Sequence, residues 1–250
     1  MALPNRLSNP ENAEIVQIVV PVYNEGDNVR TLYNTLLEEE VEFDRLSFVY
    51  DFDGDSTLPV IFELQRADHR IIAEKNTIGR GVINALKHGF SKAVAGPVLV
   101  LMGDNSDKLS IIPEMIRLWA RGAIVVSPSR YMPGGEQQGG GVIKSNLSKM
   151  AGKSLSFAGF PTSDATNNFK LYDGEWLASQ SIESKGGFEV ALELSCKAFE
   201  QKQKIYQIPT SWFDRTAGES NFKLVEWIPQ YLKWYLRALK AVASRKATGR

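Results

Sequence analysis

The sequence predicts an α/β fold in which helices flank a mostly parallel β-sheet. Two observations lead to this prediction. Short apolar runs alternate with amphipathic segments along most of the chain, which is the pattern of repeated strand–helix units. In "VYDFDGDST" and "VLVLMGDNSDKL", aspartates directly follow an apolar run, and open α/β sheets bind their ligands at such strand ends.

The expected strands are short apolar runs bounded by turn residues. In chain order they span residues 15–20, 48–51, 70–74, 98–102, 123–127, 167–172 and 204–209. Pro21 ends the first of them. The run at 98–102 is the most apolar, so we expect it at the centre of the sheet, where both faces are buried.

The expected helices have apolar residues at intervals of three or four. They span residues 29–37, 58–67, 79–94, 111–120, 143–157, 187–201 and 225–246. Asp27 or Asn28 is expected to cap the first helix, and Ser110 is expected to cap the helix over 111–120.

Two further stretches predict loops. Residues 131–141, "YMPGGEQQGGG", contain five glycines and a proline, so we expect a mobile loop without a regular element. Residues 211–224, "SWFDRTAGESNFKL", are polar and are expected to form a second loop. No linker separates independent units. We therefore expect one domain over residues 1–225, followed by a C-terminal amphipathic helix and basic tail over 226–250.

Composition limits the class of protein. The 29 basic and 29 acidic side chains leave a net charge of zero, so we expect no nucleic-acid partner. The single cysteine, Cys196, excludes an intramolecular disulfide and a multi-cysteine zinc cluster, and we expect it in the core. The sequence has no run of about 18 apolar residues and no signal-peptide pattern at its N-terminus. We expect a cytoplasmic protein, either free or peripheral on the cytoplasmic face of a membrane.

The aspartates at the two strand ends indicate a binding site. A buried carboxylate needs a donor or a cation, and two acidic strand ends repel each other unless a divalent cation lies between them. Mg²⁺ or Mn²⁺ fits, because hard cations bind carboxylate oxygens and share substrate phosphates. We expect Asp51 and Asp104 to act as a set. For Asp53, Asp55 and Asp107, capping of the following helices is an equal alternative.

Basic and hydroxyl side chains in the second half of the chain are candidates for an anion site. They are Arg130, Lys144, Ser148, Lys149, Arg215, Ser220 and Lys223. Each cation alone is also consistent with a solvated surface position. Together, with Arg as a bidentate clamp, they suit a site in which a diphosphate donor meets an anionic acceptor.

Several motifs resemble those of family 2 glycosyltransferases and occur in the same order. "VVPVYNEGDNV" is similar to the N-terminal motif of the family, and "GDNSD" occupies the position of its metal motif. The other matching segments are "NTIGRGVINALKHGF", "SRYMPGG", "DATNNFKLY", "GGFEVALEL" and "IPTSWFDRTAGESNFKL". The set is most similar to the dolichol-phosphate mannose synthase branch, the polyprenyl-phosphate glycosyltransferases. The resemblance extends from about residue 15 to residue 224.

The resemblance implies a GT-A fold, which is a Rossmann-like sheet flanked by helices, with a bound nucleotide-diphosphate sugar and Mg²⁺ or Mn²⁺ as cofactor. Implied nucleotide-sugar ligands are Pro21, Tyr23, Glu25, Asp51, Asp53, Arg80 and Asp104. Asp104 and Asp107 are the implied metal ligands. Implied acceptor and phosphate ligands are Arg130, Lys144, Ser148, Arg215, Ser220 and Lys223. The candidate catalytic residues are Asp104, Arg215 and Asp164.

The sequence also departs from the family pattern. Tyr50 replaces the first acid of the usual Asp-Asp pair, and Met102 stands where many relatives have Asp. Asp53 replaces a usual Ser and Lys144 a usual Arg. The hydrophobic C-terminal membrane spans of the family do not occur. These departures leave the nucleotide, the sugar and the acceptor open.

The implied reaction is an inverting displacement that moves a sugar to a polyprenyl (dolichyl-type) phosphate. A phosphomonoester has a second pKa of about 6 and is a dianion at neutral pH, so it needs no general base. A hydroxyl acceptor needs one, and Asp164 is the candidate. The alternatives are transfer to a soluble or glycan hydroxyl and a non-catalytic nucleotide-sugar-binding subunit.

The final helix has two interpretations. It contains Trp227, Tyr231, Trp234 and Tyr235, and the chain from Arg237 onward has only basic charges. Aromatic residues beside a cationic tail suit a membrane interface, a membrane partner subunit or a homo-oligomer contact. The other interpretation is that the aromatic residues pack on the domain core.

Overall fold

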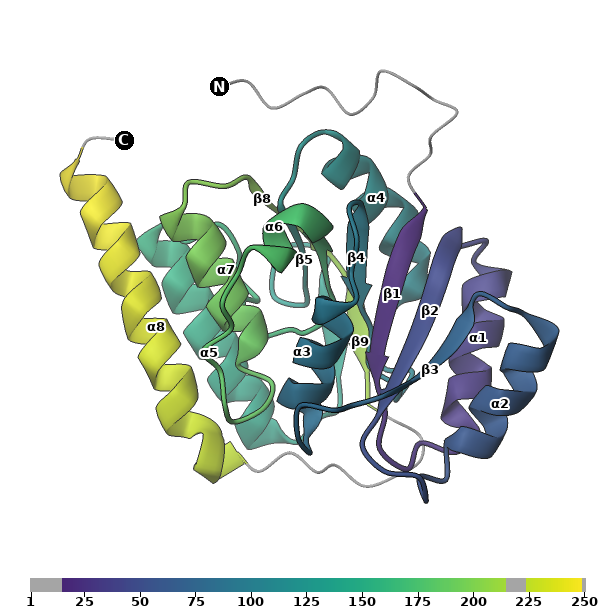
Figure 1. Ribbon diagram of the computed structural model, residues 1–250. Coiled ribbons are helices and arrows are strands. Elements are labelled where there is room, and N and C mark those ends of the chain that lie inside the picture. The colour runs from purple at the N-terminus through teal and green to yellow at the C-terminus, as the bar shows by residue number, and fades with distance from the viewer. Residues whose placement is uncertain (1–14, 215–223, 249–250) are drawn as a thin grey trace.

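The computed structural model describes residues 15–214 and 224–248. Its main sheet has seven strands in the order β3-β2-β1-β4-β7-β5-β8 (Figure 1). The strands are β1 (Val16–Pro21), β2 (Phe43–Tyr50), β3 (Ile71–Lys75), β4 (Pro97–Val100), β5 (Val125–Ser129), β7 (Lys170–Asp173) and β8 (Ile205–Pro209). Only β7 runs antiparallel to its neighbours. The predicted α/β fold is confirmed, with β4 at the centre.

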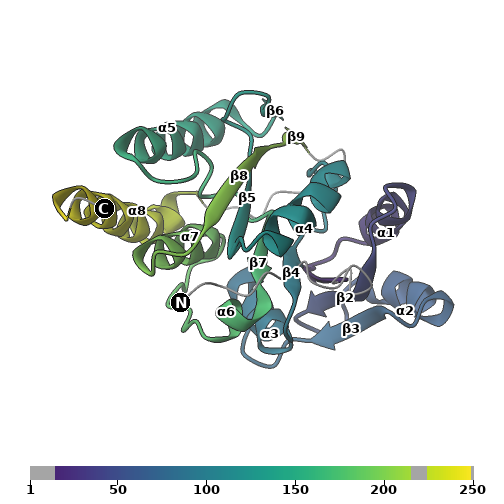
Figure 2. The ribbon, with the colours of Figure 1, turned by 90° about the horizontal axis from the view of Figure 1, so that it is seen from above.

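Helices cover both faces of this sheet (Figures 1 and 2). They are α1 (Asn28–Glu38), α2 (Leu58–Ala67), α3 (Val82–Ser91), α4 (Ile112–Ala120), α5 (Val142–Ala158), α6 (Gly174–Ala178), α7 (Val190–Glu200) and α8 (Leu224–Ala247), with the 3₁₀ helix η2 (Leu109–Ile111) before α4. None of the described helices is long and apolar enough to cross a membrane.

The sheet has a separate hydrophobic core on each face, because successive strand residues point to opposite sides. In β1, Ile18 and Val20 belong to the core with α1, α2 and α4. Val19, between them, belongs to the core with α3, α6 and α7. This packing fixes the strand ends, and therefore the loops after them, at one edge of the sheet.

A third core joins α5 and α8 to α7. Leu155 of α5 packs with Cys196 of α7 and with Trp234 and Val242 of α8. Cys196 is fully buried, as predicted. Trp234 is also fully buried, so this aromatic residue of the last helix packs on the domain. The side chain of Trp227 lies outside the described part.

The structure corrects three local predictions. Strand β2 begins at Phe43 rather than at residue 48. Both predicted loops contain a strand, because β6 (Glu136–Gln138) pairs in parallel with β9 (Ser211–Phe213). Each of these strands has its partner far away in the sequence, so no local pattern indicates it.

The capping predictions also differ from the structure. Ser110 lies inside η2, and Ile111 takes the N-cap position of α4. The expected cap is therefore wrong, because a 3₁₀ turn comes before the α-helix. Asp27 takes the N-cap position of α1 but makes no side-chain cap hydrogen bond.

Candidate functional site

The loops that follow β1, β2, β4 and β5 hold about half of the predicted site residues. Pro21 is the last residue of β1, and Arg80 lies just before α3. The β1 and β4 loops are in close contact, because a Cβ on Gly103 would lie 3.1 Å from Cγ of Glu25. Asn105 Nδ2 also donates to the carbonyl of Asn28 at 3.0 Å. The loops after β1 and β4 therefore lie side by side at one end of the sheet.

Asp51 links the β2 end to the segment before α3. Its Oδ1 accepts from Asn76 Nδ2 at 2.8 Å and its Oδ2 from the backbone N–H of Gly81 at 2.7 Å. The carboxylate therefore fixes the start of α3 as well as lining the edge.

An aromatic pair with a nearby cation lies beside Asp51. The rings of Tyr23 and Phe52 are 5.7 Å apart. The Arg80 guanidinium carbon lies 5.9 Å from the Phe52 ring centroid. Tyr23 is 54% exposed, so a flat base has an accessible ring to contact. Sequence reasoning missed Phe52, although it stands between two of the aspartates.

The other two acids of the β2 loop have different surroundings. Asp53 is exposed, and its carboxylate lies 2.6 Å from Lys75 Nζ. Asp55 is 2% exposed and accepts from the backbone N–H groups of Asn24 (3.1 Å) and Thr57 (2.8 Å). Because Thr57 is the N-cap residue of α2, Asp55 stabilises the turn into that helix. It does not cap α2 itself, because this helix has no side-chain cap hydrogen bond.

Two carboxylates after β4 form an acidic pair. Asp104 Oδ1 accepts from the backbone N–H of Ser106 at 3.2 Å. Asp107 Oδ1 is shielded from solvent and has no hydrogen-bond partner in the structure. Burial, followed by the negative charge of Asp104, raises the pKa of Asp107 to about 7.

This donor set fits a hard divalent cation. Among residues 15–214 and 224–248, no group of three or more His, Cys, Asp or Glu side chains could hold a metal by itself. Mg²⁺ typically takes only one or two carboxylates and completes its shell with water and substrate phosphates. Asp104 and Asp107 would hold such an ion, and the unpartnered oxygen of Asp107 would gain the partner that it lacks.

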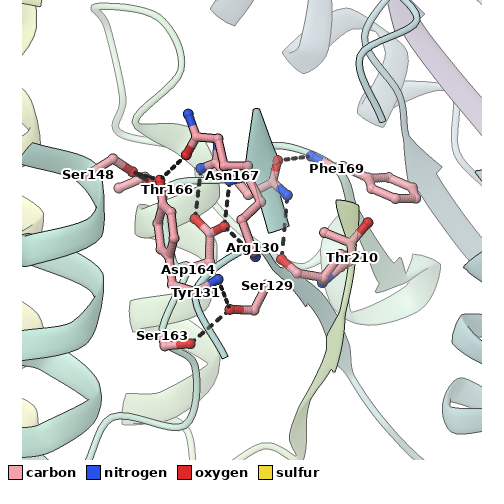
Figure 3. Close-up of polar contacts among 12 residues, drawn as sticks. Ser129, Arg130, Tyr131, Ser148, Ser163, Asp164, Thr166, Asn167, Phe169 and Thr210 are labelled. Atoms are coloured by element: carbon pink, nitrogen blue, oxygen red, sulfur yellow. Dashed lines mark hydrogen bonds and ion pairs between the residues drawn. The ribbon is translucent and has the colours of Figure 1, made fainter. Parts of the chain in front are cut away.

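Arg130 is fixed by Asp164 (Figure 3). The Asp164 carboxylate accepts from the Arg130 backbone N–H at 3.0 Å, from Nε at 2.7 Å and from a terminal nitrogen at 2.9 Å. Arg130 is 12% exposed and Asp164 is fully buried. Burial opposes the charge on Arg130, but Asp164 raises the pKa of Arg130 above its usual value.

This geometry favours a positioning role for Asp164. A general base needs an oxygen within reach of the acceptor proton, whereas this carboxylate is buried and engaged by Arg130. The assignment of Asp164 as a base remains a prediction that the observed contacts do not favour.

Lys170 is a further buried charge that sequence reasoning missed. It is fully buried, and its Nζ donates to Ser127 Oγ at 2.7 Å and to the Asp164 carbonyl at 3.0 Å. Burial lowers the pKa of Lys170 to about 7. The only signal was a lysine inside the apolar strand "NNFKLY".

Hydroxyl groups extend the site from Arg130 to α5. Tyr131 OH donates to Ser148 Oγ at 3.0 Å, and Ser148 lies 2.8 Å from Thr166 Oγ1 (Figure 3). Of the remaining predicted acceptor ligands, Arg215, Ser220 and Lys223 lie outside the described residues. Lys144 belongs to the first turn of α5, and its side chain is likewise outside the described part.

The strand β9 connects the acidic pair with Arg130. Asp107 forms an isolated antiparallel bridge with Trp212, and Phe213 N–H donates to the Ser106 carbonyl at 3.0 Å. The Arg130 guanidinium carbon lies 6.0 Å from the Trp212 ring centroid. One short strand therefore sets the spacing between a carboxylate pair and a fixed guanidinium.

Solved structures share this fold. Glucosyl-3-phosphoglycerate synthase from Mycobacterium tuberculosis, in complex with Mn²⁺, uridine diphosphate and phosphoglyceric acid, matches 90% of this chain and 78% of its own. It has 14% identity and a TM-score of 0.64. Mannosyl-3-phosphoglycerate synthase from Rubrobacter xylanophilus matches 94% of this chain and 74% of its own, with 17% identity and a TM-score of 0.62. The chain has the GT-A fold that the sequence resemblance implied.

Sequence comparison identifies the family. The profile of glycosyl transferase family 2 matches residues 17–176, so the chain belongs to this family. The dolichol-phosphate mannosyltransferase of Pyrococcus furiosus is 24% identical over 229 residues, which is 90% of this chain and 64% of that protein. A prophage bactoprenol glucosyl transferase homolog of Escherichia coli is 30% identical over 118 residues, 46% of this chain and 39% of its own. The chain spans less than two thirds of the length of either relative.

Proposed function

We propose that this protein transfers a sugar, with inversion, from a nucleotide-diphosphate sugar to a polyprenyl phosphate, with Mg²⁺ or Mn²⁺ as cofactor. One observation carries the proposal. The buried, unpartnered oxygen of Asp107 beside Asp104 lies on a loop that β9 connects to Arg130. This arrangement supports a cation site for a diphosphate beside a guanidinium for a second anion.

The donor would bind along the β1–β3 side of this edge. Tyr23 and Phe52 would contact the base, and Arg80, beside the Phe52 ring, would contact a phosphate. Asp104 and Asp107 would hold the cation, which when bound would offset charge on the leaving diphosphate. From the sequence pattern, Arg215 is a second candidate for the group that offsets the charge on the leaving diphosphate.

The acceptor would bind at Arg130. An arginine whose plane is already fixed suits the oxygens of a phosphate group. Because Asp164 is engaged by Arg130 rather than free, the site is better suited to a phosphate dianion, which needs no base, than to a hydroxyl. The names of the relatives from Pyrococcus furiosus and Escherichia coli support a polyprenyl-phosphate acceptor.

Transfer assays would test this function. The protein would be incubated with UDP- and GDP-sugars, Mn²⁺ or Mg²⁺, and either a short-chain prenyl phosphate or the matching prenyl alcohol. We expect a glycosylated product only with the phosphate. Asp104→Ala should lower the rate by about 10²-fold or more, because it removes a ligand of the cation.

The control is Glu63→Gln, which neutralises an exposed carboxylate of α2 that pairs with Arg30. It should leave the rate unchanged. Product with the prenyl alcohol but not with the prenyl phosphate would favour the hydroxyl-acceptor alternative. Donor binding without any transfer would favour the non-catalytic subunit.

A further inference from the structure

Two neighbouring helices expose several large apolar side chains. Phe157 is 96% exposed and Met150 is 70% exposed, while four others lie between 45% and 50%. These six residues, which we call the α5–α8 band, are Leu147, Met150, Phe157, Ile228, Leu232 and Leu236. No other described helix or strand has more than one exposed large apolar residue. Scattered exposed residues need no explanation, but a band does.

The six residues lie on one stripe of each helix. Their spacing along α5 and α8 is that of one helical face. Ser154 belongs to the α5 stripe, and its Oγ lies 2.8 Å from the hydroxyl of Tyr235 on α8. Leu155 and Trp234, on the inner sides, are in the third core. The two stripes therefore form one surface, and Figures 1 and 2 show the two helices side by side.

Positive charge flanks this surface. The segments of α5 and α8 contain eight of the 29 basic residues of the chain but one of its 29 acidic residues. Lys233 and Arg237 pair with Glu183 on the α7 side. Lys149, Lys153 and Lys240 are exposed and make no ion pair among the described residues.

We propose that the α5–α8 band docks on a lipid bilayer that contains anionic headgroups. Apolar side chains bordered by lysines are what such an interface needs. The proposal deepens the proposed function and rests on it, because a polyprenyl phosphate is a membrane lipid. A second copy of the chain is the weaker occupant, since a self-complementary contact would bring the lysine rims together.

The position of the band agrees with the site. Ser148 lies on α5 directly after Leu147 of the band and bonds to Tyr131 beside Arg130. Ser145 on the same helix accepts from Gln137 Nε2 at 2.7 Å. One helix thus lines the acceptor side of the site and presents the band, so docking would bring a lipid phosphate to the Arg130 side.

The test is flotation of the full chain with vesicles of phosphatidylcholine alone or with phosphatidylglycerol. We expect binding to the anionic vesicles that falls about tenfold or more in Met150→Ser/Phe157→Ser, because two exposed apolar side chains are lost. Lys149→Glu/Lys153→Glu should reduce binding to anionic vesicles by a similar factor. The matched control is Phe62→Ser, which removes an exposed Phe from α2 at the other side of the sheet.

Activity toward a water-soluble prenyl phosphate separates this proposal from the proposed function. It should be unchanged in Met150→Ser/Phe157→Ser, because neither residue lines the site. No flotation of the wild type, or equal flotation of the variant, would overturn docking even if transfer is intact. A wild-type dimer that the same substitutions dissociate would assign the band to a second copy instead.

Discussion

At the scale of single residues, the acceptor side of the site depends on one buried ion pair. Arg130 brings its charge into a largely dry position. Asp164 balances this charge, accepting two hydrogen bonds from the guanidinium and one from the Arg130 backbone N–H. Lys170 adds a buried amine that donates to the Asp164 carbonyl. Removing one partner of a buried pair leaves the other charge uncompensated, so the site should be sensitive to small changes here.

Asp164→Asn should separate a positioning role from a general-base role. The amide keeps the shape but removes the charge, so we expect a stability loss of about 3–5 kcal/mol. The KM for the phosphate acceptor should rise more than kcat falls, because Arg130 is no longer held in place. Denaturant unfolding and steady-state kinetics would measure both effects.

Asp173→Asn is the matched control for that variant. Asp173 is another buried aspartate, which caps α6 and accepts from Trp119 Nε1 at 3.0 Å, away from Arg130. It should lose stability but keep the acceptor KM. A collapse of kcat in Asp164→Asn, with the acceptor KM unchanged, would instead support the base.

At the scale of elements, α5 makes one especially close backbone contact with the loop before β7. Gly152 lies against the loop that presents Asp164, and a Cβ on this glycine would lie 2.0 Å from the Ser163 carbonyl oxygen. No residue with a side chain fits there without moving the helix. The contact therefore couples the hydroxyl groups of α5 to the Arg130–Asp164 pair.

Gly152→Ala tests that coupling by the sign of its effect. Alanine normally stabilises a helix interior by about 1 kcal/mol relative to glycine. Here the clash should reverse the sign and destabilise the protein by about 1–3 kcal/mol. Asn146→Ala, at an exposed position of the same helix, should be neutral or stabilising. Equal gains in both variants, measured by urea unfolding, would show that the contact is loose.

The elements also show where sequence reasoning succeeds and where it fails. Central strand β4 and helix α2 follow from local patterns, because an apolar run or a periodic stripe reports its own burial. Strand β6 lies among glycines and pairs with the distant β9, so nothing local distinguishes it from a loop.

The same limit applies to the site. The acidic strand ends were predictable, because a carboxylate after an apolar run is unusual in itself. Which acids are structural depends on partners in space, such as Asn24 for Asp55 and Lys75 for Asp53. The engagement of Asp164 by Arg130 is equally non-local, so the sequence alone does not distinguish a general base from a positioning residue.

At the scale of the whole molecule, the acidic pair that suits a cation also lowers the stability of the fold without one. Asp107 has a shielded oxygen without a donor, next to the negative Asp104. Such a group destabilises the protein, and a cation bound together with the donor diphosphate would compensate it. Metal and donor together should therefore stabilise the folded chain more than the donor alone.

Asp107→Asn should reverse this balance. Without ligand, the neutral amide removes the repulsion with Asp104, so the variant should melt at the same temperature as the wild type or higher. A bound ligand at 100 times its Kd adds about 2.7 kcal/mol, which is roughly 5–10 °C in Tm for a chain of this size. We expect that shift in the wild type with a nucleotide sugar and Mn²⁺, and most of it should be lost in EDTA. With a nucleotide sugar, the variant should show the same small shift in Tm in Mn²⁺ and in EDTA, equal to that of the wild type in EDTA. Differential scanning fluorimetry would measure these shifts. Equal Mn²⁺-dependent shifts in the two proteins would show that Asp107 is not a ligand of the cation.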